Sequence, residues 1–393
     1  MNFIDLFCGC GGLSEGFIQE NYKPLLLADF DEHAMETTKN RLLQIGYKSK
    51  DVDQICKLAD LSQTENSSDI LSGVGNVDVD VVAAGIPCQA FSSVGRAQDK
   101  SSMKNDKRNY LYLSLLHYIK LLSPKFILIE NVRGILSAKP EKDFIINDIF
   151  DRIEMLGYAV HKDRKDILLN AVEFGVPQVR KRVIIFAVKK SLNISPDQFF
   201  KKLVRTHYAP DNKKTKLKKY ISVKEAIEDL PILKPREGSE LYDNHKPRRN
   251  RYLKKIRGNT FRMLYNNTAR SHNEHDMKRY YHLAKNNWQL KDLQKTHPEL
   301  IHHDPKHFGN RYTVQKWDQP GKTIVSHLYK DGNLFIHPDY KQSRTFTVRE
   351  AARIQSFPDD FIFHGSRTQQ FKQVGNAVPV MLSRALAKAL KRL

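Results

Sequence analysis

The sequence predicts a doubly wound α/β domain followed by a smaller, strongly basic second domain. Up to residue 188, short runs of Val, Ile, Leu and Phe alternate with amphipathic stretches. Because these runs are almost entirely apolar, they are typical of parallel strands that helices cover on both faces. Beyond residue 188, Tyr, His, Asn and basic residues replace the runs, and regular patterns return only near the C-terminus. We therefore expect three segments, 1–188, 189–346 and 347–393.

Apolar runs and helical spacing place the individual elements. The predicted strands are residues 2–7, 24–29, 79–85, 126–130 and 183–188. The predicted helices begin at Ser14 and at Glu32 and span 110–122, 145–156, 350–356 and 381–393. Asp31 is the expected N-cap of the second helix, because its carboxylate can accept from free N–H groups of the first turn. Strands that alternate with helices in this way predict a parallel sheet.

Positive charge is concentrated in the middle of the chain. The whole sequence has 65 Lys and Arg against 44 Asp and Glu, a net charge of +21. Residues 189–316 alone contain 30 basic and 13 acidic side chains, a net charge of +17. Such a segment suits a polyanion, because neutralised phosphates release their bound counterions. A solvated surface is the alternative for any single Lys-rich run, but the concentration favours nucleic acid.

Composition excludes several classes of protein. No run of about 18 apolar residues occurs, so no membrane span is expected. The first residues lack the basic and apolar regions of a secretory signal. The four cysteines, at positions 8, 10, 56 and 88, are too few for a disulfide scaffold and predict a reducing compartment. Cys8 and Cys10 have no second pair and no nearby His, so no metal site is expected.

The first candidate site is a glycine-rich loop between a strand and a helix, in residues 5–16 (DLFCGCGGLSEG). Glycines let a backbone approach a nucleotide-like ligand, and the helix N-terminus favours its anionic end. Asp29 ends the next predicted strand, where a carboxylate can accept from ribose hydroxyls. Ser14 stands where the dinucleotide pattern G-x-G-x-x-G needs its last glycine.

The second candidate is Cys88, which follows the predicted strand 79–85 in the stretch GIPCQAFS. Open α/β sheets bind ligands at the carboxyl ends of their strands. Pro87 fixes its own φ, so it would present Cys88 in one direction. A buried, inert cysteine is the alternative. The polar loop 92–109 that comes next is long for a compact domain and is a candidate lid.

Glu130 and two arginines complete the set of candidates. Glu130 follows the strand 126–129, so it lies at the same sheet edge as Cys88 and can act as a general acid. Arg180 and Arg182 lie on one face if residues 178–182 are extended. Two guanidinium groups on one face suit an oxygen-rich substrate or phosphates. An ordinary basic edge strand is the alternative.

These four segments, in this order, resemble motifs of the DNA (cytosine-5) methyltransferase family, which uses S-adenosylmethionine. Residues 347–358 (TVREAARIQSFP) and 373–379 (QVGNAVP) are similar to the last two motifs of that family. The resemblance covers about 1–188 and 311–393 and omits the basic middle, where this family places target recognition. It implies a catalytic and cofactor-binding domain, a target-recognition domain, and a C-terminal segment that returns to the first; these are the three segments predicted above.

The resemblance also implies a Rossmann-like sheet and a role for each candidate residue. Cys88 would be the nucleophile, and Glu130, Arg182 and Arg180 would bind the cytosine. Gln89 and Ser92 would contact the DNA. The site for S-adenosylmethionine, released as S-adenosylhomocysteine, would be formed by Phe7, Gly9, Gly11, Gly12, Asp29, Phe30, Asp60, Pro87, Asn376 and Val378. Asp29 stands where the family usually has Glu, so its contact with the ribose would be longer or water-mediated.

The implied chemistry explains these residue types. Carbon 5 of cytosine is too weak a nucleophile to take a methyl group directly, so the Cys88 thiolate would first add to carbon 6. Glu130 in its protonated form would assist at ring nitrogen 3. Because a paired base is out of reach inside the duplex, the cytosine would be flipped out.

The implied partner is double-stranded DNA. The family habit suggests a monomeric bacterial modification enzyme of the cytoplasm, associated with the nucleoid and paired with a cognate restriction endonuclease. A tRNA cytosine-5 methyltransferase is one alternative, disfavoured by the long variable region. A non-catalytic DNA-binding relative is disfavoured by the presence of Cys88 and Glu130. A nicotinamide-linked oxidoreductase is disfavoured by Ser14.

Overall fold

The protein is described by a computed structural model. The described residues are 1–86, 110–139, 143–212, 216–243, 250–257, 263–301 and 311–393. The chain divides into two compact units. Unit 1 comprises residues 1–174, 181–205 and 378–393, and unit 2 comprises 175–180 and 206–377. None of the described helices is long and apolar enough to cross a membrane.

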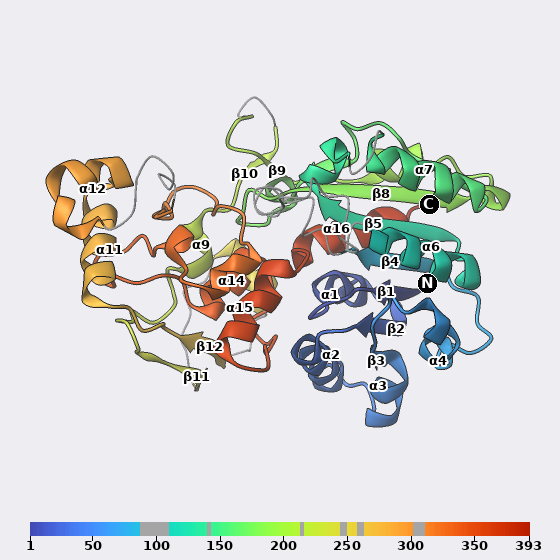
Figure 1. The fold of residues 1–393 in the computed structure, drawn as a ribbon, viewed down its shortest axis with the longest axis horizontal. Coiled ribbons are helices and arrows are strands. Elements are labelled where there is room, and N and C mark those ends of the chain that lie inside the picture. Colours follow the sequence, from blue (N-terminus) through green and yellow to red (C-terminus); the bar gives the residue numbers. More distant parts are fainter. Residues whose placement is uncertain (87–109, 140–142, 213–215, 244–249, 258–262, 302–310) are drawn as a thin grey trace. The chain divides into compact units, whose positions relative to one another are not determined.

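Unit 1 is built on one large sheet whose strands follow the order β3-β2-β1-β4-β5-β8-β6, with β7 also paired to β8 (Figure 1). The strands are β1 Asn2–Leu6, β2 Lys23–Asp29, β3 Cys56–Leu58, β4 Val81–Gly85, β5 Phe126–Val132, β6 Tyr158–Val160, β7 Leu168–Asn170 and β8 Lys181–Lys189. The neighbours from β3 to β5 are parallel, so their carboxyl ends share one edge of the sheet. We call this the carboxyl edge. The α/β class predicted from the sequence is confirmed.

Strand β8 differs from the predicted parallel sheet. It runs antiparallel to β5, with Phe126 opposite Val188 and Val132 opposite Arg182. It is also antiparallel to β6 and β7. Its central residues are completely buried, so its apolar run marks a covered strand but carries no information about direction. The antiparallel register has a useful consequence, because it brings the start of β8 to the carboxyl edge.

Helices flank this sheet and follow most of the predicted positions. They are α1 Gly12–Gln19, α2 Glu32–Gln44, α3 Ser49–Ile55, α4 Ser67–Leu71, α6 Leu111–Leu122, α7 Ile145–Met155, α8 Asp197–Lys202 and α16 Val380–Leu390. The Asp31 side chain accepts from the backbone N–H of Ala34, so the predicted N-cap of α2 is confirmed. Helix α1 packs against α16 at Gly16, where a Cβ would lie 2.4 Å from Ser383. Only a glycine permits that approach.

Unit 2 contains one helix that was predicted, at residues 350–356 (α14 in the structure), and further regular structure that the sequence patterns did not predict. Its helices are α9 Val223–Ile227, α10 Arg251–Arg257, α11 Glu274–Asn286, α12 Leu290–Thr296, α14 Val348–Ile354 and α15 Arg367–Asn376. Strand β9 (His207–Tyr208) pairs with β10 (Lys218–Lys219), and β11 (Gly238–Tyr242) pairs with β12 (Leu264–Thr268). Most of these elements are shorter than two helical turns or five residues, so they are too short to show a period.

The boundaries of the units differ from the expected ones. Residues 189–205 belong to unit 1 instead of the basic segment, because Phe199 stacks on Phe186 of β8 with ring centroids 4.1 Å apart. Residues 347–377, expected to return to the first domain, belong to unit 2. Helix α14 lies at the centre of that unit, with every one of its residues buried. The return to unit 1 comes at residue 378.

Candidate active site at the carboxyl edge

The carboxyl edge brings several predicted site residues together around the end of β4. Gly85, the last residue of β4, is in register with Glu130 of β5. A Cβ built on Gly85 would lie 3.8 Å from the Phe7 carbonyl oxygen and 3.9 Å from Glu130 Oε2. The end of β4 is therefore bordered by the glycine loop on one side and by the Glu130 carboxylate on the other. From here the chain continues toward Cys88.

The glycine loop between β1 and α1 is held in left-handed backbone conformations. Phe7 has φ 61°, Gly9 φ 55° and Gly11 φ 83°. Cys8 N–H donates to the Ala28 carbonyl of β2, which ties the loop to the neighbouring strand. Among the described residues, nothing lies within 4 Å of a Cβ built on Gly9. The loop is thus fixed in shape, and no described side chain or backbone atom fills the space that a Cβ on Gly9 would face.

Asp29 fixes the same loop from the end of β2. Its Oδ2 accepts from the Gly9 N–H at 2.8 Å, and its Oδ1 accepts from the Asp31 N–H at 2.9 Å. Burial raises the pKa of this carboxyl, although the two backbone bonds oppose the shift. Each carboxylate oxygen keeps a lone pair, so Asp29 can hold the loop and still accept from a ligand hydroxyl.

Exposed apolar side chains lie beside Asp29. Phe30 is 63% exposed, and Leu58, which is in register with Asp29, is 56% exposed. Asp60 follows two residues later, and its Oδ1 accepts from the Ser62 N–H and hydroxyl. Phe30 and Asp60 were predicted for this site, whereas Leu58 was missed. An apolar residue at a strand end was the available signal, and it becomes informative only once exposure is known.

Asp5 is the second residue that the sequence reasoning missed. Its side chain is fully buried, and Oδ2 accepts from the Ser14 hydroxyl at 2.5 Å. Within the described part of the chain, Oδ1 has no hydrogen-bond partner. Burial raises the pKa of Asp5 to about 7; the Ser14 hydrogen bond opposes this shift and the negative charge of Asp29 adds to it. A carboxyl group that titrates near neutrality therefore lies directly beneath the glycine loop.

Glu130 and Arg182 form an ion pair at the carboxyl edge. Arg182 Nε lies 2.8 Å from Glu130 Oε1, and the two side chains are about one-tenth exposed. The antiparallel register of β5 and β8 makes this pair possible, since it places Arg182 opposite Val132, two residues beyond Glu130. Arg182 Nη1 also donates to its neighbour's carbonyl, that of Lys181. Pairs that combine burial with a specific charge partner are typical of functional sites.

Arg180 has different surroundings from Arg182, although the sequence pattern suggested one shared face. Its side chain is 2% exposed. Nη1 donates to the Ile324 carbonyl at 2.5 Å, and Nη2 donates to the carbonyls of Ala377 at 3.0 Å and Gly375 at 3.3 Å. Arg180 belongs to unit 2, whereas Arg182 belongs to unit 1. The direct role predicted for Arg180 in binding cytosine stays a prediction.

Several predicted residues cannot be placed at this edge. Pro87, Cys88, Gln89, Ser92 and the loop 92–109 lie outside the described residues. Asn376 is the exposed last residue of α15 in unit 2, and Val378 is buried in unit 1. Among the described side chains, no group of three or more His, Cys, Asp or Glu is arranged to hold a metal ion.

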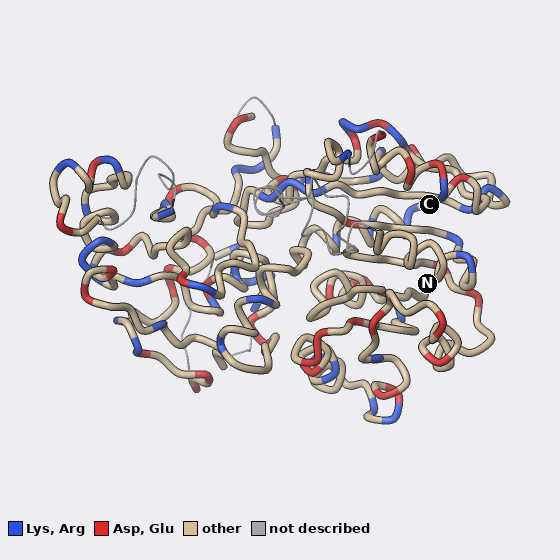
Figure 2. Tube along the Cα trace, in the orientation of Figure 1, with Lys and Arg blue, Asp and Glu red and all other residues tan. Residues whose placement is uncertain are grey.

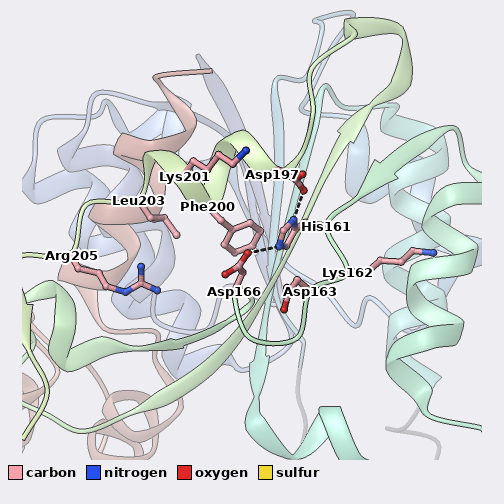
Figure 3. A pocket seen from close by; sticks show the side chains of 9 residues that line it. All are labelled: His161, Lys162, Asp163, Asp166, Asp197, Phe200, Lys201, Leu203 and Arg205. Atoms are coloured by element: carbon pink, nitrogen blue, oxygen red, sulfur yellow. Dashed lines mark hydrogen bonds and ion pairs between the residues drawn. The ribbon is translucent and has the colours of Figure 1, made fainter. Parts of the chain in front are cut away.

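A separate hollow of about 640 Å³ lies over the β6–β7 connection and α8 (Figure 3). His161 is buried at its centre, with Nδ1 2.6 Å from Asp197 Oδ1 and Nε2 3.1 Å from Asp166 Oδ2. The His161 ring packs on Phe200 with centroids 4.4 Å apart. Both ring nitrogens of His161 are thus hydrogen-bonded to carboxylates of the protein itself. These bonds connect the β6–β7 loop to α8 and have a structural role.

Comparison with known proteins identifies the family. A model of C-5 cytosine-specific DNA methylases matches residues 1–392. The type II methyltransferase M.Bpa9945I of Bacillus paralicheniformis is 32% identical to this chain, over 100% of the chain and 98% of that protein. M.DdeI of Desulfomicrobium norvegicum, also a type II methyltransferase, is 33% identical over 99% of the chain and 88% of its own length.

Solved structures share the fold. A prophage-encoded E. coli protein, described as a candidate DNA modification methyltransferase, superposes with a TM-score of 0.71 at 24% identity, over 100% of this chain and 99% of its own. The Dnmt2 methyltransferase of S. pombe has a TM-score of 0.55 at 16% identity, with coverage of 100% and 99%. The whole-chain family match and the curated relatives confirm the family that the motifs suggested: the chain belongs to the C-5 cytosine-specific DNA methylases.

Proposed function

We propose that this protein transfers a methyl group from S-adenosylmethionine to carbon 5 of a cytosine within a short, specific sequence of double-stranded DNA. The observation that carries the proposal is the Glu130–Arg182 pair at the carboxyl edge, beside the strand end that leads to Cys88. A carboxyl group and a guanidinium group together match the nitrogen and oxygen atoms on the edge of a cytosine ring. The family match over the whole chain supports the same reaction.

In the proposed reaction, Cys88 supplies the nucleophile and Glu130 acts on the ring. The Cys88 sulfur adds to carbon 6 while Glu130 donates a proton at ring nitrogen 3, so that carbon 5 becomes electron-rich. Carbon 5 then takes the methyl group. Glu130 then takes back the proton from ring nitrogen 3, water accepts the proton from carbon 5, and cleavage of the bond between sulfur and carbon 6 restores the aromatic ring and frees the Cys88 thiolate. Arg182 orients Glu130 and binds the cytosine oxygen.

The described residues fit S-adenosylmethionine, which supplies the methyl group when it is bound. None of the described residues fills the space beside Gly9, where a ligand could lie, and Asp29 can accept from ribose hydroxyls. Phe30 and Leu58 offer exposed apolar surface to an adenine ring. Residues 29–80 contain 11 Asp and Glu against 5 Lys and Arg, which suits a ligand that carries positive charge. Phe7, Gly11, Gly12, Asp60, Pro87, Asn376 and Val378 are proposed to complete the site.

Double-stranded DNA is the proposed substrate, bound in part by unit 2. Within that unit, residues 206–270 contain 17 Lys and Arg against 7 Asp and Glu. Phosphate contacts of this kind make affinity fall steeply with salt. The type II relatives suggest a modification enzyme that works beside a cognate restriction endonuclease. We further propose a monomer in the bacterial cytoplasm, with Gln89 and Ser92 in contact with the DNA and the base flipped out of the duplex.

Bisulfite sequencing of duplex DNA treated with the protein and S-adenosylmethionine tests the proposal directly. The expected result is protection of one cytosine within a short recurring sequence. Cys88→Ser should abolish this protection, and duplex DNA with 5-fluorocytosine at the target should become covalently linked to the wild type but not to the variant. Methylation of tRNA in preference to DNA, or full activity of Cys88→Ser, would contradict the proposal.

A further inference from the structure

The segment of residues 175–180 is held by backbone bonds to a distant part of unit 2. Val179 N–H donates to the Gly321 carbonyl, and Gly321 N–H donates to the Pro177 carbonyl, both at 2.9 Å. The Thr323 hydroxyl donates to the Val179 carbonyl at 2.7 Å. These bonds form one rung of a parallel ladder just before the chain enters β8. The approach to β8 is therefore fixed from residues about 140 positions away.

Two buried glutamines extend this contact to α14 and α15. Gln178 Oε1 accepts from Ile324 N–H at 2.8 Å, and its Nε2 donates to Gln355 Oε1 at 2.8 Å. Gln355 Nε2 in turn donates to the carbonyls of Val374 at 2.8 Å and Ala377 at 3.1 Å. Both glutamines are completely buried. A buried amide network of this kind specifies one arrangement, because each lost bond leaves a desolvated polar group.

Arg180 closes the network by capping the C-terminal end of α15. The carbonyls of Gly375 and Ala377 belong to the last turn and the C-cap, where no intrahelical N–H is available. A cation at this end also complements the negative end of the helix dipole. Gly375 permits the packing, since a Cβ there would lie 2.5 Å from the Ser326 nitrogen. The guanidinium thus satisfies carbonyl oxygens from two segments at once.

These contacts lie at two of the points where the chain passes from unit 2 into unit 1. Residue 180 precedes Lys181 and Arg182 of β8, and Ala377 precedes Val378 at the start of the connection to α16. The first connection leads in two residues to the Glu130–Arg182 pair. The second carries Asn376 and Val378, which are proposed to contact the cofactor. One cluster of buried polar groups therefore fixes the entry to both halves of the proposed active site.

We infer that Arg180 is a positioning residue that couples the cofactor site to the cytosine site, with Gln178 and Thr323 as its supports. This inference rests on the proposed function. The Arg180 side chain is buried, and its N–H groups already donate to three carbonyls. Direct binding of cytosine by Arg180 would therefore require its hydrogen bonds to the C-terminal end of α15 to break. A substitution that removes hydrogen bonds of Arg180 should make residues 376–378 and the start of β8 less ordered together. The cofactor affinity of the free protein would then fall along with the turnover number.

The test measures the Kd for S-adenosylhomocysteine in the absence of DNA, together with kcat, the KM for duplex DNA and the melting temperature. Arg180→Lys keeps the charge but cannot reach all three carbonyls, and we expect its Kd to rise at least tenfold and its kcat to fall at least tenfold. Thr323→Val, a milder change that preserves shape, should shift both quantities in the same direction by about threefold. If Arg180→Lys does not fold, the Thr323→Val variant still tests the inference.

Arg349→Lys is the matched control. Arg349 is also completely buried and also donates to three carbonyls, those of Tyr265, Pro358 and Phe361, but none of these carbonyls belongs to either connection. The Arg349→Lys variant should have a lower melting temperature, as the Arg180→Lys variant should, but its Kd for S-adenosylhomocysteine should stay within twofold of the wild-type value.

Two outcomes would overturn the inference. An unchanged Kd in Arg180→Lys with lower kcat or weaker DNA binding would make Arg180 a substrate contact. An equal rise in Kd in Arg349→Lys would make the effect one of general stability. Failure of the proposed function is distinguishable, because the wild type would then neither bind S-adenosylhomocysteine nor methylate DNA.

Discussion

Two regions of the molecule, one in each unit, bury charged side chains in different ways. In unit 2, Arg353 bonds both Asp229 and Asp359, Arg257 adds a second bond to Asp359, and all four side chains are almost completely buried. At the carboxyl edge of unit 1, Asp5 leaves one buried oxygen without a partner among the described residues. Charges that are fully matched inside the protein hold a fold together, whereas incomplete matching at a sheet edge is typical of a site that receives a ligand.

The distribution of charge along the chain follows the same division. Figure 2 shows acidic residues gathered over the part of unit 1 from β2 to α4, and basic residues along much of unit 2. An acidic surround suits a positively charged cofactor, and a basic unit suits the phosphates of DNA. One chain therefore offers two electrostatic environments to the two substrates of the proposed reaction.

The largest effect is expected at the incompletely matched edge. Glu130→Gln keeps the size of the side chain and removes the carboxyl proton, so kcat should fall by about 100- to 10,000-fold, the usual contribution of a general acid. The melting temperature should change by only a few degrees, because Arg182 keeps its bond to the Lys181 carbonyl and remains partly solvated. Initial rates of tritiated methyl transfer to duplex DNA measure the loss. A fall in rate that parallels unfolding would contradict the proposed role of Glu130.

In the ion-pair network of Arg353, Arg257, Asp229 and Asp359 in unit 2, loss of a charged group should lower the free energy of unfolding. Arg353→Met leaves Asp229 and Asp359 buried without their closest cation, although Arg257 still lies within 4 Å of both, and breaking such a network costs about 3–5 kcal/mol. Urea unfolding followed by fluorescence gives the loss directly. Arg152→Met on α7 is the control, since its ion pair with Asp148 is about half exposed and should contribute at most about 1 kcal/mol. Equal losses in the two variants would remove the distinction between the networks.

The contrast between the units also explains what the sequence could predict. Strands β1, β2, β4, β5 and β8 were located within a few residues from their apolar runs, and the Asp31 cap was correct. These features depend on residues close together in the chain. In unit 2, four of the six described helices are no longer than seven residues, which is too short to show a period, and of the six only α14 was predicted.

For the site residues, too, positions could be predicted from nearby residues, whereas partners that lie far away in the sequence could not. Glu130 and Arg182 were predicted as neighbours of the substrate, but their pairing depends on the antiparallel direction of β8, which its apolar run does not encode. Arg180 was grouped with Arg182 because the two are separated by one residue. Its partners, Ile324, Gly375 and Ala377, lie more than 140 residues further along the chain. Burial of Asp5 likewise results from packing between distant elements.

Acidification should destabilise unit 2 because it buries histidines in the neutral form. Burial lowers the pKa of His337 to about 4, with the positive charge of Arg344 adding to the shift. The unfolded chain takes up this proton near pH 6.5 and the folded chain only near pH 4, so stability falls as the pH drops through this interval. Between pH 7.5 and 5, His337 alone should contribute a loss of about 2 kcal/mol.

Urea unfolding of the wild type and of His337→Gln at pH 7.5, 6 and 5 measures this contribution. The variant should lose less stability on acidification than the wild type does. His33→Gln, at a partly exposed position of α2, is the control and should follow the wild type. A stability difference between His337→Gln and the wild type that stays constant from pH 7.5 to 5 would show that the pKa of this histidine does not change on folding.

Asp5 should give unit 1 the opposite dependence on pH. Burial raises the pKa of Asp5 to about 7, so between pH 3.8 and 7 the folded chain holds a proton that the unfolded chain has released. Stability therefore falls as the pH rises through this interval, and it stays lower above pH 7. Asp5→Asn removes the ionisation but places an amide where Oδ1 has no partner among the described residues.

Since that unpaired amide costs about 1–3 kcal/mol and the shift in pKa corresponds to about 4 kcal/mol, the variant should be about 1–3 kcal/mol more stable than the wild type at pH 8. At pH 4 the order should reverse, because this pH is close to the pKa of 3.8 in the unfolded chain, so that protonation of Asp5 on folding then costs less than the unpaired amide of the variant. Ser14→Ala, which removes the hydrogen bond to Asp5, should destabilise the protein at pH 8. A stability difference between Asp5→Asn and wild type that does not change between pH 4 and pH 8 would mean that the pKa of Asp5 is the same in the folded and the unfolded chain, and the contrast between the two regions would lose its electrostatic basis.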